Sequence, residues 1–224
     1  QSSNISLLAS AGLETLAVRV PKNSNAHDLL SACDCPVAAP SANRSGSISP
    51  TTSDHVTQSL GASISAVLDG GPCSIGLEST VIGFNEDQCI LLRQGGIARE
   101  EIEAVTGALQ IADNQSEISS PGMLHRHYAP DTPIRLNVRD LQSGDLVLGF
   151  GPVEQGKFPE GSLNLSVNCD LNEAASNLFS MMHQLDNAKP ASIAVMPIPD
   201  CGLGAAINDR LRRAATSDDT HDQD

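Results

Sequence analysis

Three segments that combine glycines with small polar residues, each beside a short apolar run, constrain the fold of this chain most strongly. Residues 36–52 read PVAAPSANRSGSISPTT, residues 70–84 read GGPCSIGLESTVIGF and residues 91–103 read LLRQGGIAREEIE. In the third segment Arg93 and two glycines precede a helical pattern, which places backbone N–H groups and a cation against an anion. Together the segments indicate a nucleotide or phosphate site.

Up to about residue 112, short β-branched runs alternate with helical patterns, which predicts an open α/β sheet with helices packed against it. Strands are expected at residues 16–20, 36–39, 64–69, 79–84 and 89–92. Helices are expected at residues 25–32, 52–60 and 99–107. Asn25 is the predicted N-cap of the first helix, and Gly107 is the predicted C-cap of the last.

A second α/β unit is predicted after a linker. Residues 113–133 hold prolines and serines without periodicity, as expected between domains. Beyond them, apolar runs alternate with helical patterns, which predicts a small, parallel, Rossmann-like sheet. The predicted organisation is a first domain over 1–112, the linker, a second domain over 134–216 and an acidic tail over 217–224.

The charge of the chain argues against strong direct binding of a nucleic acid. The formal net charge is −14, whereas capture of a phosphate backbone needs clustered Lys and Arg. No apolar run is long enough for a membrane span and no leader-like start is visible, so we expect a cytoplasmic protein without a membrane partner. The six cysteines lack the paired spacing of a zinc site, and we expect reduced structural thiols.

The order of several motifs resembles a known family. RVP, APSANRSG, SPTT, DGGPCSIGLESTV and LLRQGG resemble, in sequence and spacing, the YrdC-like threonylcarbamoyl-adenylate synthases. SPGMLHRHYAP resembles the linker of the long, two-domain form of that family, and PIPDCGLGAAINDRLRRAA resembles the end of its second domain. The resemblance implies an α/β protein with a YrdC-like twisted open sheet, here partial, and a smaller Rossmann-like C-terminal domain.

The resemblance implies that Arg19, Ala39 and Ser79 bind L-threonine. Arg19 would pair with the substrate carboxylate, which suits a planar guanidinium. Judged by its own position at the end of an apolar run, Arg19 also fits a solvent-facing residue. Glu78, beside Ser79, is interpreted as a structural hydrogen-bond acceptor and not as a general base.

The resemblance also implies a set of ATP contacts with two supporting residues. The contacts are Thr15, Ser41, Ser49, Arg93 and His127, and the supporting residues are Asn43 and Tyr128. Ser41 and Asn43 fit a capped turn equally well. Ser49 is expected to cap the next helix as well as to bind the nucleotide. His127 and Tyr128 would form part of a lid.

Arg93 is the strongest candidate for a phosphate contact, because it lies between an apolar run and the glycines that open the next helix. An ion pair with Glu100 or Glu101 is the alternative for its side chain. His127 and His125 have metal-like spacing, but two ligands make no convincing metal site.

The chemistry implied by the resemblance joins L-threonine, bicarbonate or carbon dioxide, and ATP. The amine forms a carbamate, whose oxygen attacks the α-phosphorus and expels pyrophosphate. Such a step needs alignment and charge neutralisation, by arginine and Mg²⁺, but no protein nucleophile, so no catalytic residue and no metal ligand is assigned. The product would pass to a separate transferase that modifies tRNA.

One departure from the family pattern bears on activity. The family's synthase domain begins with a stretch that holds a threonine motif and further ATP-binding residues, and this sequence has no counterpart. We therefore expect the isolated chain to be poorly folded or inactive, with exposed apolar surface. A non-catalytic nucleotide-binding module of the same fold is the alternative function. A carbamoyl-adenylate enzyme of the hydrogenase-maturation type ranks third, because its additional domains have no counterpart here.

Overall fold

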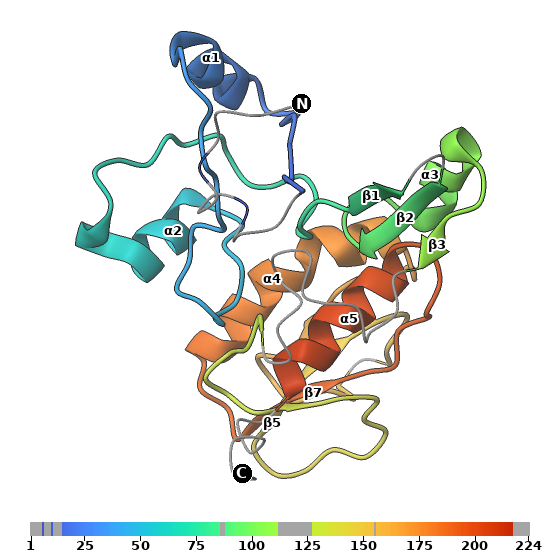
Figure 1. Cartoon of the computed structure of the whole chain (residues 1–224). Helices are drawn as coiled ribbons and strands as arrows, with labels where there is room; N and C mark the ends of the chain where they lie inside the picture. The colour runs from blue at the N-terminus through green and yellow to red at the C-terminus, as the bar shows by residue number, and fades with distance from the viewer. Residues whose placement is uncertain are drawn as a thin grey trace, which may run out of the picture.

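The computed structural model describes residues 6, 10, 15–85, 88–111, 127–154 and 156–216 of the chain. Within these residues it holds a mixed α/β fold with two separate sheets (Figure 1). The first half contributes helices α1 (Ser24–Ala32) and α2 (Ser53–Leu60), a short 3-10 helix (Gly61–Ser63), and a three-stranded sheet with helix α3 (Arg99–Thr106). The expected α/β class is confirmed.

The first sheet is built around a tight antiparallel pair. Strand β1 (Val81–Asn85) pairs antiparallel with β2 (Gln88–Arg93), and β3 (Gln110–Ile111) pairs parallel with β2. Helix α3 connects β2 to β3 and ends at Gly107, as predicted, with a positive φ of 81° that favours glycine. This arrangement places Arg93 and the two glycines after it at the end of β2.

Three predicted strands are wrong. Residues 16–20, 36–39 and 64–69 belong to no strand, although they carry the β-branched residues that favour one. Val18 and Val20 are 83% and 80% exposed. A strand is defined by hydrogen bonds to a neighbour, and the described residues offer these segments no partner strand. The predicted exposure of apolar surface in this half is confirmed.

Two predicted helix caps are also wrong. Asn23, and not Asn25, caps α1, because its side chain accepts the Ala26 N–H. Thr52 caps α2 by accepting the His55 N–H, so Ser49 does not have the capping role. In both cases the sequence offers several cap-forming residues in succession, and propensity alone does not choose among them.

The second half forms a four-stranded parallel sheet, as predicted. Its order is β4 (Ile134–Arg135), β7 (Ser192–Val195), β5 (Asp145–Gly149) and β6 (Leu163–Asn164). Helices α4 (Leu171–Asn187) and α5 (Leu203–Ala215) lie side by side and contribute most of the buried apolar residues (Figure 1). Asp145, buried at the start of β5, accepts hydrogen bonds from Arg135 and Ser192 and so ties three strands together.

The two halves share one hydrophobic core. Ile48 and Leu77 of the first half belong to the same buried cluster as α4 and α5. Gly76 lies against the α4 backbone: a Cβ at this position would come within 2.6 Å of the Ala175 and Ser176 carbonyl oxygens. Only glycine permits this close approach. Among the described residues, no helix combines the length and the apolar composition needed to cross a membrane.

Candidate functional site

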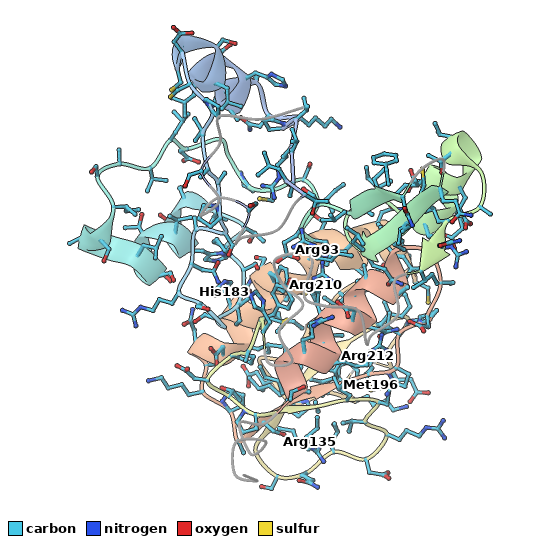
Figure 2. All side chains as sticks on the ribbon, in the orientation of Figure 1. Arg93, Arg135, His183, Met196, Arg210 and Arg212 are labelled. Carbon is cyan, nitrogen blue, oxygen red and sulfur yellow. The ribbon has the colours of Figure 1, made fainter. Side chains whose placement is uncertain are left out.

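A cluster of charged and polar side chains lies where the first sheet meets α5. The Glu78 cluster, as it is called below, consists of Ser49, Glu78, Arg93, His127, Tyr128 and Arg210. Four of these six residues are predicted ATP contacts or supporting residues. The six residues come from five separate parts of the chain, and Figure 2 shows Arg93 and Arg210 close to each other beside α4 and α5.

Glu78 is the centre of this cluster. Its Oε1 accepts a hydrogen bond from the Ser49 hydroxyl, and its Oε2 accepts one from Arg210 Nε at 2.9 Å. Burial disfavours the charged carboxylate, but Arg210 and Ser49 outweigh this cost and hold the pKa of Glu78 below its usual value. Glu78 is therefore an ionised structural acceptor, which confirms that interpretation of its role.

Arg93 extends from the end of β2 towards residues 77–80, which are named the Glu78 turn. Its Nε and Nη2 both donate to the Ser79 carbonyl, at 3.3 and 2.9 Å. Burial lowers the pKa of Arg93, and the nearby charges of Arg210 and Arg19 lower it further. Several cations therefore face the same region, although the chain as a whole is strongly acidic. Such a concentration of positive charge attracts an anion.

Backbone contacts hold the Glu78 turn against residues 95–97, which are named the glycine turn. The Gly96 N–H donates to the Glu78 carbonyl at 2.8 Å. The Thr80 hydroxyl both donates to the Ile97 carbonyl and accepts from the Ile97 N–H. A Cβ on Gly95 would collide with the Glu78 carbonyl oxygen, so this position requires glycine. The second and third glycine-rich segments thus form one unit.

His127 and Tyr128 cover the cluster on the side of α4 and α5. Their rings meet edge to face at 4.0 Å, and Tyr128 also contacts Phe179 on α4. Tyr128 is 1% exposed and has a positive φ of 63°, a conformation that a bulky residue rarely adopts. The Arg210 guanidinium lies 5.1 Å from the centre of its ring.

The environment of His127 favours the neutral imidazole. Burial lowers the pKa of His127, and nearby arginines lower it further against the opposing effect of Glu78. Its Nδ1 is buried and finds no hydrogen-bond partner among the described residues. A ligand donor or acceptor in this place would satisfy that atom.

The remaining predicted residues are not part of the cluster. Thr15, Ala39 and Ser41 are exposed. Asn43 donates to the Arg44 and Ser47 carbonyl oxygens and so supports the turn that carries it. The assignment of these four residues to threonine or ATP stays a prediction.

Arg19 and Ser79, both predicted threonine contacts, lie closer to the cluster. Both are exposed: the charge of Arg19 influences Arg93, and the Ser79 carbonyl accepts from Arg93. The hydroxyl of Ser49 donates to Glu78, so its only hydrogen is engaged. Roles in substrate binding stay predictions for Arg19, Ser79 and Ser49, as they do for Arg93 and His127.

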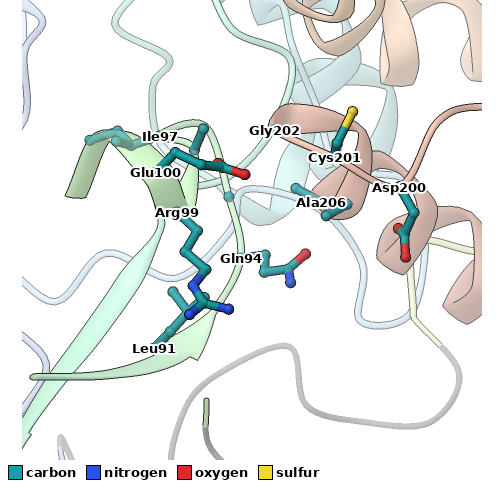
Figure 3. Close-up of a pocket in the computed structure, with 12 residues that line it drawn as sticks. Leu91, Gln94, Ile97, Arg99, Glu100, Asp200, Cys201, Gly202 and Ala206 are labelled. Atoms are coloured by element: carbon teal, nitrogen blue, oxygen red, sulfur yellow. The ribbon is translucent and has the colours of Figure 1, made fainter. Parts of the chain in front are cut away.

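A pocket of about 200 Å³ lies between the start of α3 and the start of α5, and Gln94 is one of its lining residues (Figure 3). Its lining includes Arg99, Asp200 and Gly202. No predicted site residue lines it. Within the described residues, no group of three or more His, Cys, Asp or Glu side chains is arranged to hold a metal ion.

Arg210 is the residue of the cluster that sequence reasoning missed. The pattern of residues 204–215 predicts a packed terminal helix, and the helix is there. Arginines at positions 210, 212 and 213 look alike in sequence, but only position 210 falls among the buried positions of α5. A charged residue in the apolar stripe of an amphipathic helix was the available signal.

Two family models match the chain. The model described as "Threonylcarbamoyl-AMP synthase, C-terminal domain" matches residues 97–216, and the model described as "Telomere recombination" matches residues 1–95. The chain is 37% identical to a threonylcarbamoyl-AMP synthase of Bacillus subtilis, over 92% of this chain and 64% of that protein. It is 36% identical to a threonylcarbamoyl-AMP synthase of Pyrococcus abyssi, over 91% of this chain and 65% of that protein.

Solved structures give a similar result. A crystal structure of P. abyssi Sua5 complexed with L-threonine matches with a TM-score of 0.80 and 31% identity, over 96% of this chain and 68% of that chain. A second P. abyssi Sua5 structure matches with a TM-score of 0.77 and 28% identity. The chain spans less than two thirds of the length of the curated relatives from B. subtilis and P. abyssi.

Proposed function

The chain belongs to the threonylcarbamoyl-AMP synthase family, and from this premise we propose that it takes part in the synthesis of L-threonylcarbamoyladenylate. The substrates are L-threonine, bicarbonate or carbon dioxide, and ATP, and the second product is pyrophosphate. In this proposal the protein is a nucleotidyltransferase that serves the threonylcarbamoyl modification of tRNA.

The observation that carries the proposal is the convergence of arginines on the Glu78 cluster. The charges of Arg210 and Arg19 both act on Arg93, and Glu78 supplies one compensating carboxylate. The backbone amides and glycines that follow Arg93 lie at the same place. Cations beside a glycine turn at the start of a helix suit the phosphates of a nucleotide. We assign Arg93 to the phosphates and His127 to the nucleotide.

L-threonine is the proposed amino-acid substrate. One structural relative is a P. abyssi Sua5 complexed with L-threonine, at 31% identity to this chain. In the present chain Arg19 carries the charge that suits the substrate carboxylate, and the backbone near Ala39 and Ser79 is assigned to the rest of the amino acid.

The proposed reaction balances without a protein nucleophile. The threonine amine and bicarbonate give a carbamate and water, and a carbamate oxygen then attacks the α-phosphorus of ATP. The bond between the α-phosphorus and the bridging oxygen breaks, and pyrophosphate leaves with the electron pair. The chain's contribution is alignment of the reactants and stabilisation of the leaving charge by Arg93.

Mg²⁺ is proposed to enter with ATP. The described residues supply no set of carboxylates for such a cation, since Glu78 is engaged by Arg210 and Ser49. The proposal places the reaction in the cytoplasm, and a separate tRNA-modifying transferase receives the product, without strong nucleic-acid binding by this acidic chain.

Pyrophosphate release by the purified chain tests the proposal. ATP and bicarbonate are supplied with and without L-threonine, and release that requires threonine supports the synthase activity. Release at the same rate without threonine, or with glycine in its place, contradicts the substrate assignment. Binding of ATP with no release under any condition identifies a non-catalytic nucleotide-binding module instead.

A further inference from the structure

Arg210 on α5 is a buried cation with partners in both halves of the chain. Its side chain is 1% exposed. Nη1 donates to Asp209 on the same helix, whereas Nε donates to Glu78 at 2.9 Å and Nη2 donates to the Gln94 carbonyl at 2.8 Å. Burial of an arginine is costly unless its donors are all engaged. Two of these partners lie more than 100 residues earlier in the chain.

The first contact orients Ser49. Because Oε2 of Glu78 accepts from Arg210, the carboxylate is held with Oε1 towards the Ser49 hydroxyl. The position and hydrogen-bond direction of Ser49 therefore depend on a residue of α5. Residues that hold a binding group in place affect affinity without touching the ligand.

The second contact orients Arg93. Gln94 lies between Arg93 and the glycine turn, and its carbonyl is fixed by Arg210. The Glu78 turn and the glycine turn also contact each other directly through the Gly96 N–H. Arg210 thus bridges the Glu78 turn and Gln94, the residue before the glycine turn. The relative position of these two segments sets where the Arg93 guanidinium lies.

We propose that Arg210 is a positioning residue for ATP: it holds the Glu78 carboxylate and the Gln94 carbonyl together, and so sets the positions of Ser49 and Arg93. The inference rests on the proposed function, because it takes Ser49 and Arg93 as nucleotide contacts. It gives the second half of the chain a specific part in the nucleotide site. Arg210 itself is buried and acts through its two partners.

The charge arrangement fits a binding role better than a purely stabilising one. Arg93 and Arg210 are close enough to repel each other, and this repulsion opposes folding. A polyanion beside Arg93 relieves the repulsion when it binds. If the cluster served stability alone, placing Arg93 beside Arg210 would add only an unfavourable interaction between two like charges.

The first test compares Arg210→Lys with Arg212→Lys in the full chain, by calorimetric titration with ATP. Lysine keeps the charge, but a single ammonium lacks the planar fork that reaches both Glu78 and the Gln94 carbonyl. We expect the dissociation constant for ATP to rise on the order of tenfold in Arg210→Lys. Arg212 is an exposed neighbour on the same helix, and its variant is expected to bind ATP as the parent does.

A double variant separates positioning from stability. Arg210→Met with Glu78→Gln removes both buried charges, so its thermal midpoint should return towards the parent value from that of Arg210→Met alone. We expect ATP affinity to stay weak even so. Recovery of ATP affinity together with stability overturns the inference, and so does an unchanged dissociation constant in Arg210→Lys.

The same measurements keep the two proposals apart. A parent chain that binds ATP but releases no pyrophosphate contradicts the synthase activity and leaves the role of Arg210 measurable through the dissociation constant. A parent chain that releases pyrophosphate, with Arg210→Lys equal to it in ATP affinity, contradicts the role of Arg210 alone. A parent chain that binds no ATP overturns both.

Discussion

The imidazole rings of His55 on α2 and His183 on α4 lie 4.0 Å apart and connect the two halves of the chain. His183 Nε2 lies 3.2 Å from the Ser49 carbonyl, and because a carbonyl only accepts, this nitrogen carries the hydrogen. His55 Nδ1 accepts from the Thr51 N–H at 3.3 Å. A nitrogen that accepts carries no hydrogen, so the His55 ring is neutral in this contact, which lies beside the segment that carries Ser49.

Stability should fall as the solution is acidified. Burial lowers the pKa of His55 despite the nearby Asp54, and burial together with His55 lowers the pKa of His183. Below about pH 6.5 the unfolded chain takes up protons that the folded rings resist, so the free energy of unfolding decreases. The loss levels off once the pH passes the lower folded-state pKa values. Thermal midpoints between pH 7.5 and 5.5 measure the effect.

Two variants serve as controls for this pH dependence. His183→Gln removes one member of the pair and should give a shallower slope of midpoint against pH. His27→Gln changes an exposed residue of α1 and should keep the parent slope. Equal slopes in all three proteins would contradict the assignment to the His55–His183 contact.

Loss of the Arg93 guanidinium should abolish most of the proposed activity. Arg93→Ala removes the cation nearest the glycine turn, and we expect threonine-dependent pyrophosphate release to fall on the order of a hundredfold. Arg139→Ala, at an exposed position of the second half, should retain the parent rate. Comparable rates in the two variants would show that Arg93 has no part in catalysis.

Gly95→Ala should be strongly destabilising. The added methyl group collides with the backbone of residues 78–80, which no side-chain rotation relieves. We expect a loss of about 3 kcal/mol or more in the free energy of unfolding. In Gly83→Ala the nearest atom is Cδ1 of Leu92 at 3.0 Å, at the end of a flexible side chain. That variant should lose less than about 1 kcal/mol in urea unfolding, and similar losses for both would refute the packing argument.

Tyr128→Ala should also destabilise the chain. The ring is buried against Phe179, His127 and Arg210, so its removal leaves a cavity and exposes the buried cation. A cost of about 3 kcal/mol or more is expected from chemical denaturation. Phe84→Ala, where the ring is 72% exposed, serves as the comparison and should change stability little.

The second half of the fold could be predicted from sequence because its signals are local. The apolar stripe of α4 and the β-branched run of β7 each lead to the observed element, and the parallel order follows from their alternation. The strands expected at residues 16–20 and 36–39 depend on partners elsewhere, and local preference does not supply them. For this reason the prediction was right for helices and wrong for these extended segments.

The site could be predicted only in part. The glycine-rich segments contain Arg93 and Ser49, and the linker motif that resembles the family contains His127; the fold brings these three residues near Glu78. The contribution of Arg210 depends on a contact between residues 132 positions apart, and no motif records it. Motif spacing indicates which residues suit a phosphate. The contacts that Arg210 makes with their neighbours can be identified only from the folded structure.

The ion pair between Glu78 and Arg210 also sets an order of events during translation. At roughly 5–20 residues added per second, Arg210 is made about 7 to 26 seconds after Glu78, since 132 positions separate them. Throughout that interval the nascent first half holds the carboxylate without its cation. The Glu78 cluster is thus completed only when α5 has been made and packs against the first half. A chain that stops before α5 lacks the cation that compensates Glu78 and contacts the Gln94 carbonyl.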